Sequence, residues 1–144
     1  MIEEGPWLTD EKRAEVGALV CAGAESVGYK GLATFEFLRD KNGEFYFLEV
    51  NPRVQVEHTV TELITGYNLV ELGIRVAQGE SLPLRQDQVK IRGHAIQCRL
   101  NAEDTTNFAP SPGRLWECHF PSGFGIRCNT HAHPGYELSL IHIS

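Results

Sequence analysis

This sequence of 144 residues lacks long apolar runs and lacks clusters of basic residues. No apolar stretch approaches the roughly 20 residues that a transmembrane helix needs, so we expect a soluble protein with no membrane partner. The chain has 13 Lys and Arg against 19 Asp and Glu, for a formal net charge of -6. This acidic balance argues against nucleic acid as a partner.

Cysteine is also scarce, and no CxxC pair occurs among Cys21, Cys98, Cys118 and Cys128. Together with the absence of a secretory signal, this spacing predicts reduced thiols and a cytoplasmic protein. Cys128, His131 and His133 raise the idea of a soft-metal cluster, but their spacing matches no closed zinc site. With 42% hydrophobic residues, the chain has the composition of one domain or of a piece of one.

The stretch from Phe45 to Glu62 concentrates the polar groups that could do chemistry. In it, a polar or charged residue recurs at every second position: Glu49, Asn51, Arg53, Gln55 and Glu57. If the segment is extended, these side chains share one face. Partial burial of so many polar and charged groups costs free energy unless a charged molecule or ion binds to them. The pattern therefore predicts that this face lines a metal-binding and anion-binding site. The alternative is a solvated sheet face.

A hairpin should place two acids opposite each other. Residues 34–38 and 45–50 have strand composition, and Asn42-Gly43 between them predicts a two-residue turn. Counting outward from that turn pairs Lys41 with Glu44, Asp40 with Phe45, Leu38 with Phe47, and Glu36 with Glu49. Facing carboxylates about 5 Å apart at Cβ repel each other unless a cation lies between them. Asn51 adds a third oxygen ligand, and oxygen ligands without Cys or His favour Mg²⁺ or Mn²⁺.

The remaining patterns predict an α+β fold. Thr9 is a helix cap, and helical spacing continues to a stop at Gly28. Residues 60–65 predict a short helix that ends at Gly66, and Asn68 caps the helix that follows. Ser81-Leu-Pro83 marks a boundary between two domains. Beyond it, alternation predicts strands over residues 94–100 and 115–120.

Several motifs resemble one family. The segment Phe47-Leu-Glu-Val-Asn-Pro-Arg-Val54 is similar to the signature of the ATP-grasp superfamily that carbamoyl-phosphate synthases and biotin-dependent carboxylases share. The segments from Gln55 to Gly66, 92–95 and 98–104 resemble the biotin carboxylase branch. The resemblance implies the C-terminal part of an ATP-grasp domain over residues 1–83 and the start of a biotin carboxylase C-terminal domain over residues 84–137.

The resemblance also assigns roles residue by residue. It implies that Glu36 and Glu49 bind ATP through two metal ions, Mg²⁺ or Mn²⁺, with Asn51 as a further ligand. It places Arg53, Gln55 and the backbone of Val56 in a bicarbonate pocket, makes Glu57 the general base, and makes Arg99 the arginine that steadies the biotin enolate. Taken singly, Arg53 reads as a surface arginine and Glu57 as a helix N-terminal acid, and His58 is as readily a packed histidine as a site residue.

The family's function implies the partners. These are ATP, bicarbonate, biotin on its carboxyl carrier protein, and carboxyltransferase subunits or domains, with a homodimer for the full-length protein. We expect an internal fragment of such a ligase, inactive by itself, and a non-native tail over residues 138–144. The alternatives are a non-catalytic module that binds metal or pairs with other subunits, and a carbamoyl-phosphate-synthase-like ligase. The final acceptor, for example acetyl-CoA in fatty acid biosynthesis, propionyl-CoA, pyruvate or urea, is set by another domain.

Overall fold

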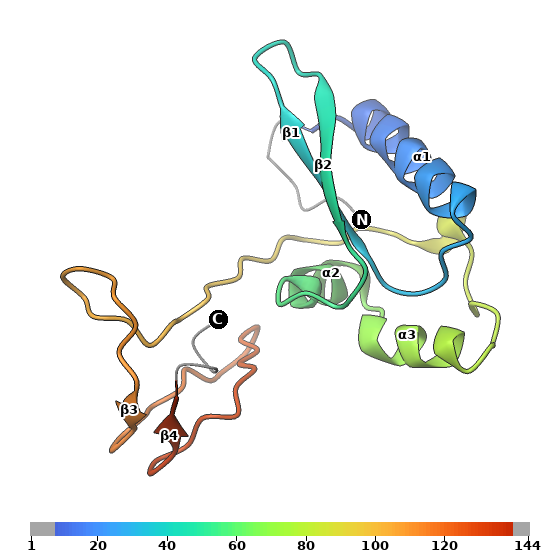
Figure 1. The fold of residues 1–144 in the computed structure, drawn as a ribbon. Coiled ribbons are helices and arrows are strands. Elements are labelled where there is room, and N and C mark those ends of the chain that lie inside the picture. Colours follow the sequence, from blue (N-terminus) through green and yellow to red (C-terminus); the bar gives the residue numbers. More distant parts are fainter. Residues whose placement is uncertain (1–7, 140–144) are drawn as a thin grey trace. The chain divides into compact units, whose positions relative to one another are not determined.

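The computed structural model describes residues 8–139, which form an α+β fold as the sequence predicts (Figure 1). The chain divides into two compact units, Met1–Gln97 and Cys98–Ser144. The first unit contains α1 (Asp10–Ser26), β1 (Thr34–Arg39), β2 (Phe45–Asn51), α2 (His58–Thr65), α3 (Leu69–Ala77) and the 3₁₀ turn η1 (Gln86–Gln88). Within residues 8–139, no helix combines the length and the apolar character that crossing a membrane requires.

Helix α1 begins and ends where its local signals predict. The Thr9 side chain accepts a hydrogen bond from the backbone N–H of Lys12 at 3.2 Å, which satisfies one of the free donors at the helix start. Gly28 follows the last turn with φ of 63°, a left-handed conformation that glycine adopts without strain. Val16, on the inner side of α1, is 2% exposed and is the most buried apolar residue of the unit's small core.

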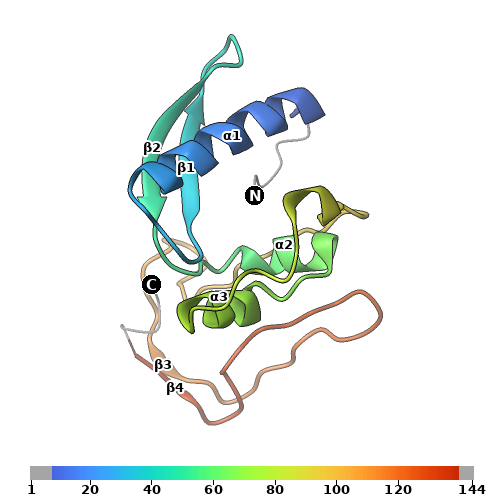
Figure 2. The ribbon, with the colours of Figure 1, turned by 90° about the vertical axis from the view of Figure 1, so that its right-hand side faces the viewer.

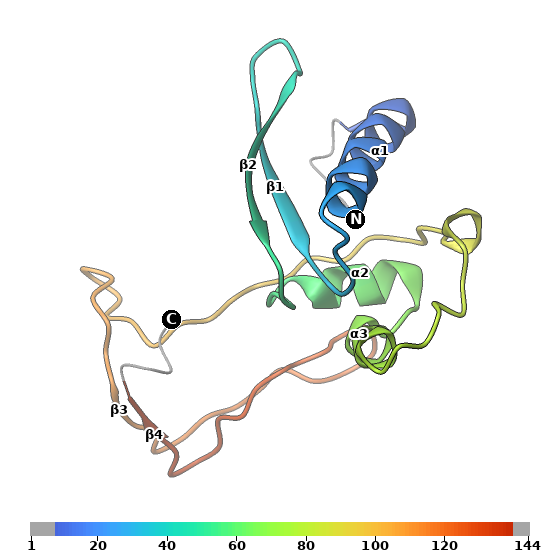
Figure 3. The ribbon, with the colours of Figure 1, turned by 45° about the vertical axis from the view of Figure 1, so that its right-hand side comes forward.

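Helix α1 covers one face of the antiparallel β1–β2 hairpin (Figures 2 and 3). A methyl group built on Gly23 would lie 3.8 Å from the ring of Phe35, so the helix approaches the sheet closely at this glycine. Lys12 Nζ lies 5.8 Å from the ring centroid of Phe45, and Phe37 makes edge-on contacts with both Phe45 and Phe47. The phenylalanine side chains therefore share the face that α1 covers, and Glu36, between Phe35 and Phe37, belongs to the opposite face.

The hairpin turn is one residue longer than predicted. Asp40 N–H donates to Glu44 O at 3.0 Å, so the loop contains Lys41, Asn42 and Gly43. Only Gly43 has positive φ, at 91°, whereas a two-residue Asn-Gly turn of the predicted type needs positive φ at both residues. The Asp40 carboxylate explains the difference, because Oδ1 accepts from the N–H groups of Asn42 and Glu44, both at 2.9 Å.

A β-bulge then corrects the register. The pairs next to the turn are Arg39 with Phe45, Leu38 with Tyr46 and Phe37 with Phe47, so the predicted pairs Lys41–Glu44, Asp40–Phe45 and Leu38–Phe47 are wrong. Leu48 is left without a partner, and the ladder resumes at Glu36 opposite Glu49, as predicted. A bulged residue changes which face the following side chain takes. Glu49 therefore lies on the opposite face from Phe47, whereas regular alternation would put them on the same face.

Helices α2 and α3 follow the hairpin and pack by specific local contacts. Gly66 ends α2 in a left-handed conformation, with φ of 78° and its N–H bonded to Glu62 O at 2.8 Å. Asn68 caps α3 by accepting from Glu71 N–H at 3.0 Å, as predicted. A methyl group on Gly73 would lie 2.8 Å from Leu32 Cδ1, so α3 needs glycine there for its contact with the chain before β1.

The second unit has little regular structure. Its one ladder within the described residues joins β3 (Gly113–Arg114) to β4 (Glu137–Leu138). The predicted strands over 94–100 and 115–120 are wrong, because neither segment pairs with another strand in the described residues. The backbone hydrogen bonds that Leu115 makes with residues 135 and 136 are the exception. Alternation specifies an extended backbone, but a strand also needs a neighbour. The predicted non-native tail includes residues 140–144, which lie outside the described residues.

Candidate active site

The two facing acids of the hairpin are joined by one amide. Asn51, the last residue of β2, donates from Nδ2 to Glu36 Oε1 at 2.9 Å and to Glu49 Oε1 at 3.1 Å. Glu36 is half-buried and Glu49 is exposed. A single NH₂ group that reaches both carboxylates requires the two oxygens to converge on one point. The amide thereby supplies partial positive charge between two negative groups whose direct interaction is unfavourable.

Arg53 and Gln55 extend this cluster, although not by the alternation that the sequence predicts. Strand β2 ends at Asn51, and Pro52 starts an irregular segment, so the five predicted residues do not lie along one strand. Arg53 Nη2 nevertheless lies 3.5 Å from Asn51 Oδ1, and Gln55 Nε2 lies 3.4 Å from Glu36 Oε1. Gln55 Oε1 is buried without a hydrogen-bond partner among the described residues. An orphaned buried acceptor is costly, so it marks a place for a donor from a bound molecule.

The turn after Gln55 presents backbone donors. Gln55 O accepts from the His58 backbone N–H at 3.2 Å and contacts His58 Nδ1 at 2.7 Å, and Val56 O accepts from Gln97 Nε2 at 3.0 Å. In the described part of the chain, the N–H groups of Val56 and Glu57 donate to no acceptor. The Glu57 side chain, at the N-terminus of α2, likewise makes no hydrogen bond or ion pair to residues 8–139.

The acidic pair fits a hard divalent cation. Two carboxylates and an amide are oxygen-donor side chains of the kind that Mg²⁺ and Mn²⁺ use, and Asn51 can present Oδ1 to the pair when its amide group turns over. Among the described residues no group of three or more His, Cys, Asp or Glu side chains could hold a metal ion by itself. The pair therefore needs Asn51, and a ligand such as phosphate, to complete a coordination shell.

The remaining sequence candidates belong to the second unit. Arg99 belongs to the second unit, where its side chain is exposed and forms no hydrogen bond or ion pair with described residues. His131 and His133 do not form a metal cluster with Cys128; their rings contact Tyr136 edge-on, with centroids 5.0 Å and 5.4 Å from its ring. All four cysteines are free thiols.

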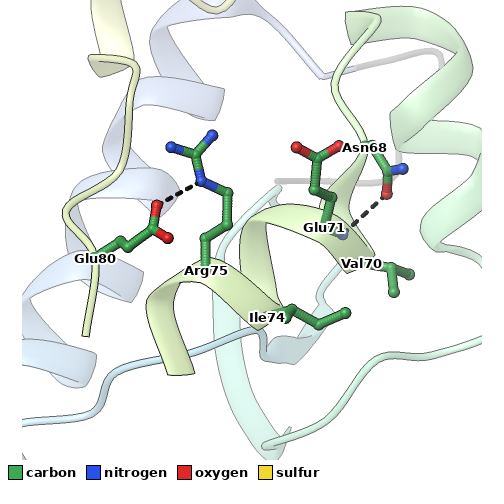
Figure 4. A pocket seen from close by; sticks show the side chains of 6 residues that line it. All are labelled: Asn68, Val70, Glu71, Ile74, Arg75 and Glu80. Carbon is green, nitrogen blue, oxygen red and sulfur yellow. Dashed lines mark hydrogen bonds and ion pairs between the residues drawn. The ribbon is translucent and has the colours of Figure 1, made fainter. Parts of the chain in front are cut away.

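A surface hollow of about 520 Å³ on α3 contains none of the predicted site residues (Figure 4). Two hydrogen bonds join its polar residues: Arg75 Nε donates to Glu80 Oε2 at 2.7 Å, and Asn68 Oδ1 accepts from the backbone N–H of Glu71. Apolar contacts come from Val70 and Ile74. Beyond the Arg75–Glu80 pair, the hollow is lined by one further carboxylate, that of Glu71, whereas two facing carboxylates converge on one amide at the hairpin.

Two residues of the site were missed or left open by the sequence. His58 was equally compatible with packing, and the structure places it half-buried with its ring against the carbonyl of Gln55. Gln97 carried no signal, because a glutamine on an alternating segment is ordinary and its partner Val56 lies 41 residues away. Only the fold brings the two together.

Comparison with known proteins identifies the class. The family described as "Carbamoyl-phosphate synthase L chain, ATP binding domain" matches residues 1–85, and "Biotin carboxylase C-terminal domain" matches residues 97–142. The first match covers more than half of the chain, so this is an ATP-grasp protein. Within that class, the chain belongs to the biotin carboxylase family.

Named relatives agree with this assignment. The chain is 49% identical over 140 residues to a biotin carboxylase of Allochromatium vinosum and 47% identical over 141 residues to a pyruvate carboxylase subunit from Methanothermobacter thermautotrophicus. These matches cover 96% of this chain but 31% and 28% of the relatives, so the chain spans about a third of their length. The biotin carboxylase domain of Hydrogenobacter thermophilus 2-oxoglutarate carboxylase, solved with MgADP, ADP and bicarbonate, superimposes with a TM-score of 0.93 at 43% identity over 99% of this chain and 32% of that one.

Proposed function

We propose that this chain forms the metal-binding and bicarbonate-binding part of a biotin carboxylase, which uses ATP to carboxylate biotin. The observation that carries the proposal is the convergence of Glu36 and Glu49 on Asn51 Nδ2, at 2.9 Å and 3.1 Å. This is a pair of hard oxygen ligands joined by one amide group. The three residues would hold Mg²⁺ or Mn²⁺, as two ions, and the positive charge of these ions would neutralise charge on the phosphates of ATP.

The groups beyond Asn51 suit a small planar anion. A guanidinium matches the two oxygens of bicarbonate with a fork of donors, which is the role proposed for Arg53. Within residues 8–139, Gln55 supplies a buried acceptor without a partner, and Val56 supplies a backbone N–H without an acceptor. Bicarbonate attacks poorly until its remaining proton is removed, so a carboxylate must lie within reach. Glu57, whose side chain is unengaged within the described residues, is the proposed base.

The proposed reaction has three steps. Bicarbonate oxygen attacks the γ-phosphorus of ATP as ADP leaves, and Glu57 takes the bicarbonate proton. Carboxyphosphate breaks its C–O bond to give CO₂ and phosphate. Phosphate then takes the proton from the ureido nitrogen of biotin, and the resulting enolate, stabilised by Arg99, attacks CO₂. Arg53 and Gln55 orient the anion, so their contribution is mainly positional.

The further partners are part of the same proposal. Biotin would arrive on its carboxyl carrier protein, and carboxyltransferase subunits or domains would use the product. We also propose a homodimer for the full-length protein and a cytoplasmic location, where free thiols stay reduced. The biotin carboxylase C-terminal match and the named carboxylase relatives favour this activity over a carbamoyl-phosphate-synthase-like ligase.

A chimera tests the proposal. In it, residues 8–139 replace the matching segment of the Allochromatium vinosum biotin carboxylase, and ATP cleavage is measured by a coupled assay with free biotin. We expect cleavage that requires bicarbonate and that falls by about 10² to 10⁴ in kcat for Glu57→Gln. The matched control is Glu25→Gln, on exposed α1 surface, with no expected effect. A chimera without bicarbonate-dependent cleavage, or with equal losses in both variants, would contradict the proposal.

The second candidate function is a non-catalytic module that binds a cation or pairs with other subunits. It is favoured for the isolated chain by the few buried residues, of which Val16 and Ile64 are the apolar ones within the described part. The same assay on the 144-residue chain should give no bicarbonate-dependent ATP cleavage. Turnover by the isolated chain would refute this expectation.

A further inference from the structure

Two side chains that were given no role in the proposed function form hydrogen bonds to the turn that contains the proposed anion site. His58 Nδ1 lies 2.7 Å from Gln55 O, and Gln97 Nε2 donates to Val56 O at 3.0 Å. The two carbonyls are consecutive along the backbone. Each is therefore held by a donor from a different part of the first unit, one from α2 and one from the extended segment that ends that unit.

Holding a carbonyl also aims the next N–H. A peptide unit is planar, and in the trans form its C=O and N–H point in opposite directions. The described residues contain no cis peptide bond. When His58 holds Gln55 O, the N–H of Val56 must point away from His58, and when Gln97 holds Val56 O, the N–H of Glu57 must point away from Gln97. Neither N–H has an acceptor within residues 8–139.

The His58 contact also fixes the tautomer. A carbonyl oxygen only accepts, so the ring nitrogen at 2.7 Å must carry hydrogen, which leaves Nε2 unprotonated in the neutral ring. His58 therefore uses its Nδ1–H on the backbone, and Nε2 keeps its lone pair. Its side chain is half-buried, which limits the other orientations that the ring can adopt.

We propose that His58 and Gln97 are positioning residues that aim the N–H groups of Val56 and Glu57 at bicarbonate. This inference rests on the proposed function for the identity of the anion. Neither residue touches the anion; each acts through a carbonyl of the turn. Because each contact is a single hydrogen bond, its loss should cost roughly a factor of 3 to 10 in anion affinity.

Matched substitutions in the chimera separate positioning from general structure. Asn places an amide N–H close to the position of His Nδ1, whereas the longer Gln does not. His58→Gln should therefore raise the bicarbonate KM by roughly 3 to 10-fold with the ATP KM unchanged, and His58→Asn should stay near the unsubstituted chimera. Gln97→Met keeps the length of the side chain but removes the hydrogen-bond donor, so it should raise the bicarbonate KM by a similar factor. Gln78→Met, on an exposed glutamine after α3, is the control.

A spectroscopic measurement stands independently of turnover. With ¹⁵N-valine labelling, bicarbonate should shift the Val56 amide resonance of the chimera, and His58→Gln should reduce that shift while His58→Asn keeps it. An absent shift, equal behaviour of the two His58 variants, or a parallel rise in the ATP KM would overturn the inference. If the chimera fails to cleave ATP but the Val56 shift and its response to His58 remain, the proposed function fails and the positioning role stands.

Discussion

Replacing Glu49 by Gln should reveal what the facing acids are for. The substitution keeps the size of the side chain and removes one of the two charges that meet at Asn51. Two unit charges about 5 Å apart repel by about 1 kcal/mol in a water-like dielectric and by about 3 kcal/mol at an effective dielectric constant of about 20. Glu49 is exposed and Glu36 is half-buried, so the lower figure applies.

The cation-free chain should therefore change little in stability. Removing the repulsion stabilises the Glu49→Gln chain by about 1 kcal/mol, while the hydrogen bond from Asn51 to a neutral acceptor is weaker and offsets part of this gain. The response to cation should change much more. At a cation concentration 100 times Kd, the unsubstituted chain gains about 2.7 kcal/mol of unfolding free energy, and a 100-fold weaker variant gains only about 0.4 kcal/mol.

The assay is urea unfolding of the 144-residue chain, followed by far-UV circular dichroism with and without Mg²⁺ or Mn²⁺. Glu44→Gln is the matched control, because Glu44 lies in the same hairpin but faces Lys12, with 3.9 Å between Oε2 and Nζ. Its cation response should equal that of the unsubstituted chain. The reasoning is refuted if Glu49→Gln and Glu44→Gln gain the same stability from cation.

Three further predictions concern the scaffold. Gly17→Ala, with open space around the added methyl group, should raise the unfolding free energy by about 0.5 to 1 kcal/mol, whereas Gly73→Ala should lose most of that gain to its packing clash; a thermal melt that ranks them equally would contradict this. The backbone N–H of Glu44, and then those around it, hold the pKa of the Asp40 carboxyl below its ordinary value, so the stability it contributes is present above the unfolded-state pKa and is lost as pH falls through the folded-state pKa. Urea midpoints measured down an acid series should show this loss, and Asp40→Asn should lack it. Deleting Leu48 removes the unpaired residue but keeps the acids facing, so the cation response should persist; its disappearance would mean that the bulge itself shapes the site.

Local signals were sufficient for the helices and insufficient for the hairpin turn. Thr9, Gly66 and Asn68 act within a few residues of the helices that they begin or end, so the local sequence predicts these helix ends. At the turn, the Asp40 carboxylate accepts hydrogen bonds from the N–H groups of Asn42 and Glu44 in place of backbone carbonyls. The facing of the two acids was predicted correctly because the longer turn and the bulge at Leu48 offset each other.

Contacts between distant residues set the limit at the candidate site. Asn51 was predicted beside the acids because strand geometry connects them over two residues. Arg53 was predicted from alternation that stops at Pro52, and its contact with Asn51 comes from the bend of the backbone. Gln97 could not be predicted, since nothing local ties a glutamine to a carbonyl 41 residues earlier.

The amide of Asn51 has a consequence for ion exchange at the proposed metal site. Many metal proteins must refold each time the ion is lost, because the ligands repel one another or scatter once it leaves. At the proposed site, the Asn51 amide would hold the two carboxylates together whenever no ion is bound, so the ligands would stay close to one another. Under this proposal, ion binding would exchange one partner of the carboxylates for another, which would suit an ion that enters with each nucleotide and leaves with the product nucleotide.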